Sequence, residues 1–272
     1  MRTILIAGLW LTSNLAAGAA WAQQVPPNET GVTMGHWHLN SPNVEASKKM
    51  FVAMGGNAIK NDVFDVVRFP NVRVNLNLRP GAPPANGGTA GSIVNHVGFT
   101  VPNVPEAYAK WKAAGVPVVM GNGTPENKRT DQAYVIAPDG LRIEILENKD
   151  QKVPVENEHI HFFVQEAVIP QMQAWYGKTF GAKPGTRNNG AIADLPGVQL
   201  RFNKSDTPTV STKGRVLDHI GFDIKGLEAF TKKLEASGIK LDRPYTPNPN
   251  GGGLAFIYDP WGTYIELNEY RP

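Results

Sequence analysis

Two stretches of sequence, NHVGFTV at Asn95–Val101 and DHIGFDI at Asp218–Ile224, determine how this chain is organised. They share a histidine, a glycine and a phenylalanine in the same places and lie 123 residues apart. Because the spacing persists over three separate blocks, the sequence predicts two homologous halves. The other repeated blocks are Ala113–Val116 with Ala236–Ile239, again 123 residues apart, and Pro138–Glu144 with Pro260–Glu266, 122 residues apart.

Each half contains two smaller units. In the first half, HWHL at His36–Leu39 and HVGF at His96–Phe99 each precede Pro-Asn-Val and a helix-like stretch closed by glycine. Strand-like segments follow each helix. We therefore expect α+β architecture: four β-α-β-β-β modules paired into two cup-shaped mixed sheets, with helices outside. The expected boundaries are a lead at 23–34, a first domain at 35–148, a polar linker at 149–157 and a second domain at 158–272.

The composition excludes several kinds of chemistry. The 272 residues include no cysteine, so disulfides, thiolate zinc sites, iron–sulfur clusters and cysteine nucleophiles are excluded. A formal net charge of +3 is small for this length, and no long basic tract is present, so nucleic acid is not an expected partner. A transition metal would have to be held by imidazole and carboxylate groups.

The first 22 residues predict export. They carry one charge, Arg2, then an apolar run at Ile4–Leu11, and end in Ala-Trp-Ala at Ala22. The run is too short to span a bilayer, so we expect a signal peptide cleaved after Ala22. The mature protein is then periplasmic or secreted, with no membrane anchor.

Period-two alternation separates the histidines from the apolar side chains. At His96–Val101, Val97, Phe99 and Val101 share one face while His96 lies on the other. All six histidines occupy repeat-matched positions, each opposite an apolar face. With one glutamate in each half they form two sets of two imidazoles and one carboxylate, a set that suits non-haem Fe(II), and also Mn(II) or Zn(II). The matched pairs are His36 with His159, His38 with His161, His96 with His219 and Glu144 with Glu266.

These motifs resemble the vicinal oxygen chelate superfamily, which includes glyoxalase I, bleomycin-resistance proteins, fosfomycin-modifying enzymes and extradiol dioxygenases. The resemblance covers the mature chain and implies a divalent metal inside each paired sheet. It implies the ligands His36, His96 and Glu144 in the first domain, and His159, His219 and Glu266 in the second. It also implies a small-molecule substrate with vicinal oxygens; the oligomeric state stays open.

The sequence departs from the family patterns in two places, and these departures bear on whether a glyoxalase or an extradiol dioxygenase reaction is expected. Glyoxalase-type isomerases add a carboxylate ligand where this chain has Arg73, Asn75 and Asn77 or Gln199, Arg201 and Asn203. Extradiol dioxygenases have a histidine and then a tyrosine before the last glutamate. Tyr134 fits that tyrosine in the first half, Phe256 replaces it in the second, and the histidine is missing from both.

His38 and His161 are candidates for the missing acid–base group. Each lies two residues from a ligand on the same strand face, about 6–7 Å further along. The alternative is that they only orient a ligand. With Tyr134 they make up the candidate catalytic residues.

Three readings of function remain open. The first is an exported metal-dependent enzyme acting on an oxygen-chelating substrate, nearest by ligand set to dioxygenase-type members. The second is a binding protein of the bleomycin-resistance type, or a glyoxalase-type lyase or isomerase. The third has one active and one structural domain.

Overall fold

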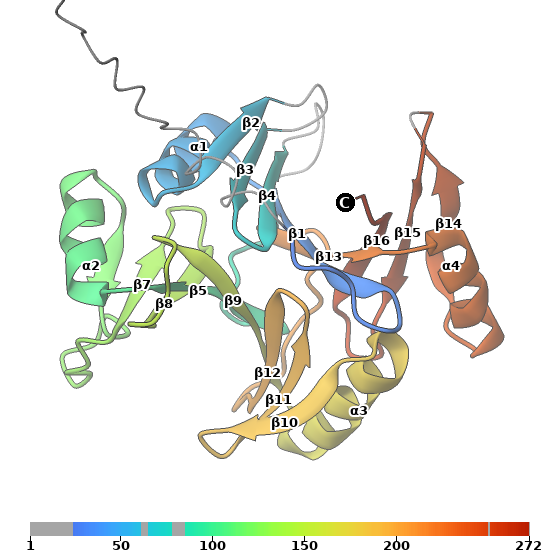
Figure 1. Ribbon diagram of the computed structural model, residues 1–272. Coiled ribbons are helices and arrows are strands. Elements are labelled where there is room, and N and C mark those ends of the chain that lie inside the picture. Colours follow the sequence, from blue (N-terminus) through green and yellow to red (C-terminus); the bar gives the residue numbers. More distant parts are fainter. Residues whose placement is uncertain (1–23, 61–64, 78–84, 250, 272) are drawn as a thin grey trace, which may run out of the picture.

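The computed structural model describes residues 24–60, 65–77, 85–249 and 251–271. Within these ranges the chain forms two mixed sheets of eight strands each, with helices packed on them (Figure 1). The expected fold class is confirmed. The predicted signal peptide lies outside the described residues.

The first sheet combines the beginning and the end of the chain. Its strand order is β14-β15-β16-β13-β1-β4-β3-β2. The strands are β1 (Val32–Asn40), β2 (Asn57–Lys60), β3 (Asp65–Phe69), β4 (Val72–Asn77), β13 (Leu217–Ile224), β14 (Leu241–Pro247), β15 (Gly253–Tyr258) and β16 (Tyr264–Glu269).

The second sheet is built from the middle of the chain. Its order is β10-β11-β12-β9-β5-β8-β7-β6. The strands are β5 (Val94–Val101), β6 (Val118–Met120), β7 (Gln132–Ile136), β8 (Arg142–Glu147), β9 (Glu156–Val164), β10 (Lys183–Arg187), β11 (Gly190–Leu195) and β12 (Val198–Lys204).

The modules pair across the two halves of the chain. β1 of the first module runs antiparallel to β13 of the fourth, and β5 of the second runs antiparallel to β9 of the third (Figure 1). The expected domains at 35–148 and 158–272 imply that each half closes its own sheet, which is wrong, because each sheet takes strands from both halves. Periodicity assigns a residue to a face, but it does not say which strand is the neighbour.

The repeated Pro-Asn-Val motif starts the two helices of the first half. The Asn43 side chain accepts a hydrogen bond from the backbone N–H of Ala46 at the start of α1 (Val44–Ala53). Asn103 does the same for Glu106 in α2 (Val104–Ala113). These are N-caps, which satisfy backbone donors that the first turn leaves free. The second half has η1 (Glu166–Val168), α3 (Ile169–Phe180) and α4 (Leu227–Ala236).

Apolar packing joins the two sheets within each half. The Phe99 ring of β5 lies 5.0 Å from Trp37 of β1 and 4.6 Å from Phe69 of β3, between ring centroids. In the second half, Phe180 of α3 lies 4.9 Å from Phe222 of β13. Each half thus shares one apolar interior, while backbone hydrogen bonds connect the halves.

Removing the Phe99 ring should weaken the whole fold. Phe99 is fully buried between the sheets, so Phe99→Ala should lower the free energy of unfolding by about 3–5 kcal/mol, measured by urea denaturation. Val210→Ala, at a half-exposed side chain, should change it by less than about 0.5 kcal/mol. A loss below about 1 kcal/mol for Phe99→Ala would contradict a core shared by both sheets.

Candidate metal centres

A β-bulge precedes each of four histidines. In the strand registers, one residue of each bulged strand has no partner across the ladder. A bulge turns two consecutive side chains toward the same region, which strict alternation forbids. The bulged residues and the histidines that follow them are Gly35 and His36, Asn95 and His96, Glu158 and His159, and Asp218 and His219.

The first cluster consists of His36, His38, His219 and Glu266, whose ligand atoms all lie within 4.8 Å of one another. Glu266 Oε2 is 2.8 Å from His219 Nε2 and 3.3 Å from His36 Nε2. The His38 ring stacks on His219, with 4.4 Å between centroids. This cluster joins β1 to β13 and β16.

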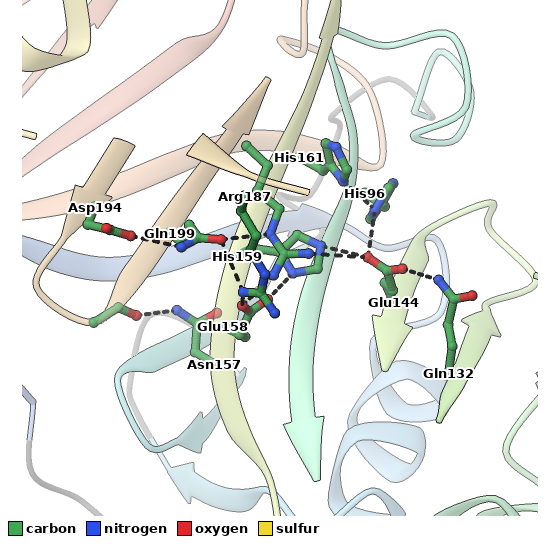
Figure 2. A network of polar contacts seen from close by, with 12 residues as sticks. His96, Gln132, Glu144, Asn157, Glu158, His159, His161, Arg187, Asp194 and Gln199 are labelled. Atoms are coloured by element: carbon green, nitrogen blue, oxygen red, sulfur yellow. Dashed lines mark hydrogen bonds and ion pairs between the residues drawn. The ribbon is translucent and has the colours of Figure 1, made fainter. Parts of the chain in front are cut away.

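The second cluster consists of His96, Glu144, His159 and His161, within the same 4.8 Å limit (Figure 2). Glu144 Oε2 is 3.3 Å from His96 Nε2 and 3.1 Å from His159 Nε2. His161 Nδ1 lies 2.9 Å from His96 Nε2. This cluster joins β5 and β8 to β9.

The structure brings all six predicted ligands into clusters, but the predicted grouping is wrong. The groups His36/His96/Glu144 and His159/His219/Glu266 do not form. Instead His36 joins His219 and Glu266, and His159 joins His96 and Glu144. The reason is the strand pairing across the halves, which exchanges the first-strand histidine of each predicted group.

A glycine lies across the ladder from one histidine in each cluster. Gly98 pairs with His159, and Gly221 pairs with His36. A Cβ at either glycine would overlap the opposing imidazole ring. The glycine of the repeated His-x-Gly-Phe motif therefore makes room for a ligand from the neighbouring strand.

Three of the four bulged residues contact Nδ1 of the histidine that follows them. Glu158 contacts Nδ1 of His159 and binds Arg187 (Figure 2). Arg201 binds the same glutamate. Asp218 lies 2.6 Å from Nδ1 of His219, and Asn95 lies 2.9 Å from Nδ1 of His96. Such partners fix ring orientation, which leaves Nε2 directed toward the cluster.

Burial and mutual contacts set the charges of the clusters. Desolvation lowers the pKa of His96 to about 4, and it also lowers the pKa of His36, so both rings are neutral near pH 7. Burial acts to raise the pKa of Glu144 and Glu266, but the hydrogen bonds with His96 and His219 and the electrostatic effect of the other nearby histidines outweigh it and hold both carboxylates ionised. At His219, burial lowers the pKa, but Asp218 and Glu266 outweigh it and raise it.

These groups fit a divalent metal. Nε2 of His36 and Nε2 of His159 are buried and make no hydrogen bond, although each lies close to a glutamate oxygen. A buried ring nitrogen without a partner is costly unless something else occupies it. Neutral imidazoles and one carboxylate are ligands that Fe(II), Mn(II) and Zn(II) accept.

The three predicted catalytic residues separate between the clusters. Tyr134 and His161 both contact His96 in the second cluster, with the Tyr134 hydroxyl 3.4 Å from Nε2. His38 lies in the first cluster, where Phe256 occupies the place of Tyr134. Among the described residues, a tyrosine hydroxyl lies within hydrogen-bond distance of a cluster histidine only in the second cluster, because the Tyr264 ring beside His219 directs its hydroxyl to Asp242.

The sequence reasoning missed Gln132 and Glu158. Gln132 donates a hydrogen bond to Glu144 from β7 (Figure 2). Its position, two residues from Tyr134 on one strand, was a usable signal for the same face. Glu158 gave no such signal, because alternation directs it away from His159 and only the bulge reverses this.

Along the described residues, no helix has the length and hydropathy required to cross a bilayer.

Comparison with known proteins agrees with this architecture. Glyoxalase I from Zea mays superimposes with a TM-score of 0.70 at 17% identity, covering 88% of this chain and 92% of that one. A candidate dioxygenase from Bacillus subtilis gives a TM-score of 0.65 at 12% identity, covering 92% and 87%. At such identities the likeness shows the fold alone. No curated protein matches the chain.

The sequence profile of the Glyoxalase/Bleomycin resistance protein/Dioxygenase superfamily matches twice, at residues 33–145 and 158–267. The two matches together span most of the chain and correspond to its two halves. The chain therefore belongs to this superfamily, as a tandem member.

Proposed function

We propose that the protein is a metal-dependent enzyme that acts, at the second cluster, on a small substrate with two adjacent oxygens. The observation that carries this proposal is the meeting of three ligand groups with Tyr134 and His161 on one sheet face. By ligand set it is nearest to dioxygenase-type members. Fe(II) is the favoured metal, with Mn(II) or Zn(II) as alternatives.

A divalent ion at this cluster would act as a Lewis acid on the substrate oxygens and, as Fe(II), would support oxygen chemistry. The protein side chains then orient the substrate and hold its proton. His161 Nε2 is buried without a hydrogen bond, and burial lowers the pKa of His161 to about 2, so the ring is neutral and can accept a hydrogen bond from a substrate hydroxyl. Burial raises the pKa of Tyr134, so its hydroxyl stays protonated and can donate to a substrate oxygen.

The first cluster suits a structural or binding role better. Phe256 stacks on Tyr264 beside His219, with 4.9 Å between centroids. Neither ring places a hydroxyl where Tyr134 has one, since the Tyr264 hydroxyl donates to Asp242. This arrangement favours the reading in which one cluster is active and the other binds without turnover.

A glyoxalase-type reaction is less well supported. The residues of β12 that pair with His159 and His161 are Gln199 and Arg201. Arg201 lies 3.9 Å from Glu144 through Nη1. A guanidinium therefore stands on the strand from which a fourth, carboxylate ligand would be required.

Metal content of paired variants tests the clusters. His36→Ala with His219→Ala removes two ligands from one cluster, so the double variant should retain about one metal per chain by elemental analysis. His36→Ala with His96→Ala disrupts both clusters and should retain none. If each half held its own metal, the two results would be exchanged. Absence of metal from the wild type after anaerobic Fe(II) or Mn(II) loading would refute metal binding.

Measurements of turnover test the proposed catalytic roles of His161 and Tyr134. With Fe(II) and a panel of catechols, oxygen uptake should fall about 100-fold or more in His161→Gln and in Tyr134→Phe, because each loses a group that handles a proton. Metal content should stay at the wild-type level. His38→Gln is the matched control and should retain activity. Loss of activity in His38→Gln alone would place turnover at the first cluster instead.

Export is part of the proposal. It rests on the single charge, short apolar run and Ala-Trp-Ala ending of the first 22 residues. Amino-terminal sequencing of protein from a periplasmic fraction should begin at Gln23. An intact Met1 on the mature protein in the cytoplasm would contradict it.

A further inference from the structure

A pocket of about 270 Å³ beside the first cluster is lined by three arginines. Arg68 comes from β3, Arg73 from β4 and Arg271 from the end of the chain. Gln24 and Gly35 also line it, so the pocket adjoins the bulge that precedes His36. No metal ligand of either cluster is among its lining residues.

The strand registers show that this pocket differs from its counterpart in charge. In the first sheet, Arg68 pairs with Arg73, and Arg73 pairs with His36. In the second sheet, Asp194 pairs with Gln199, and Gln199 pairs with His159. Residues paired across strands lie on one face. At matched positions the second sheet therefore has an aspartate and an amide where the first has two guanidinium groups.

The bulged residues at the equivalent positions of the two sheets, Glu158 and Gly35, also differ in charge. Glu158 supplies a carboxylate that Arg201 and Arg187 bind in the second sheet. Its counterpart Gly35 has no side chain, and a Cβ there would lie 2.6 Å from Asp223 Oδ1. Each sheet therefore has a carboxylate at this place, Glu158 in the second and Asp223 in the first, but in the first sheet Arg68 also lines the pocket.

Of the paired arginines Arg68 and Arg73, only Arg73 has a carboxylate partner. Asp223 accepts bonds of 2.9 Å from Arg73 at both oxygens and one of 2.8 Å from Gln24. Among the described residues, Arg68 has neither a carboxylate nor a hydrogen-bond partner, and it faces the like charge of Arg73 across the ladder. Like charges directly opposite destabilise a sheet pair unless an anion compensates them.

We propose that this pocket binds the carboxylate or phosphate group of a small anion, with Arg68 as its principal recognition residue. Guanidinium groups bind both oxyanions through paired hydrogen bonds, so the two classes share one recognition chemistry. The proposal does not depend on turnover at the second cluster.

Calorimetric titration of the metal-loaded protein with inorganic phosphate and with succinate, at constant ionic strength, tests the pocket. The wild type should bind at least one of these anions saturably, at one equivalent. Arg68→Gln should weaken that binding tenfold or more, whereas Arg68→Lys, which keeps the charge, should weaken it less. The anion that binds identifies the class.

Arg129→Gln is the matched control, because it changes the net charge by the same amount as Arg68→Gln. Arg129 is half-exposed and pairs with Asp131. It should bind the anion like the wild type. Metal content should be the same in all variants, which separates this test from that of the metal centres. Absence of saturable binding by the wild type, or equal weakening in Arg68→Gln and Arg129→Gln, would overturn the proposal.

Discussion

Antiparallel pairing of β1 with β13 and of β5 with β9 is the constraint on which the rest of the structure depends. These two ladders join the halves of the chain, and they contain the four bulges that precede ligand histidines. They also place Gly98 opposite His159 and Gly221 opposite His36, which gives each imidazole its space. The same strand pairing that builds the sheets therefore also brings the histidines of each cluster together.

Duplication has preserved the ligands and changed their surroundings. Both clusters keep three histidines and one glutamate. Around the second, Tyr134, Gln132 and Arg201 provide polar groups, whereas Phe256 and Tyr264 stack beside the first. Ligand positions are fixed by ladder geometry, but flanking positions on neighbouring strands are free to diverge. The two clusters therefore share their ligand sets and differ in the side chains around them.

Much of the fold could be predicted from sequence because its signals are local. Alternation assigned Val97 and Phe99 to the core, and the repeated asparagines Asn43 and Asn103 marked real helix starts. The bulge at Glu158 could not be predicted, since it depends on an unpaired residue in a ladder between segments distant in sequence. The neighbour of each strand could not be predicted either, because His36 could join His96 of the first half or the equivalent His219 of the second.

Pairing of strands across the halves gives each cluster the same types of ligand residue as pairing within a half would give. The residue types in the sequence therefore do not reveal which pairing occurs. Its consequence is energetic. Because each cluster takes ligands from both halves, an ion bound there stabilises their association as well as their folding. An ion present at 100 times its dissociation constant adds about 2.7 kcal/mol per site to the bound state. Separated halves would have no complete cluster to bind it, so metal binding and the joining of the halves must be thermodynamically coupled.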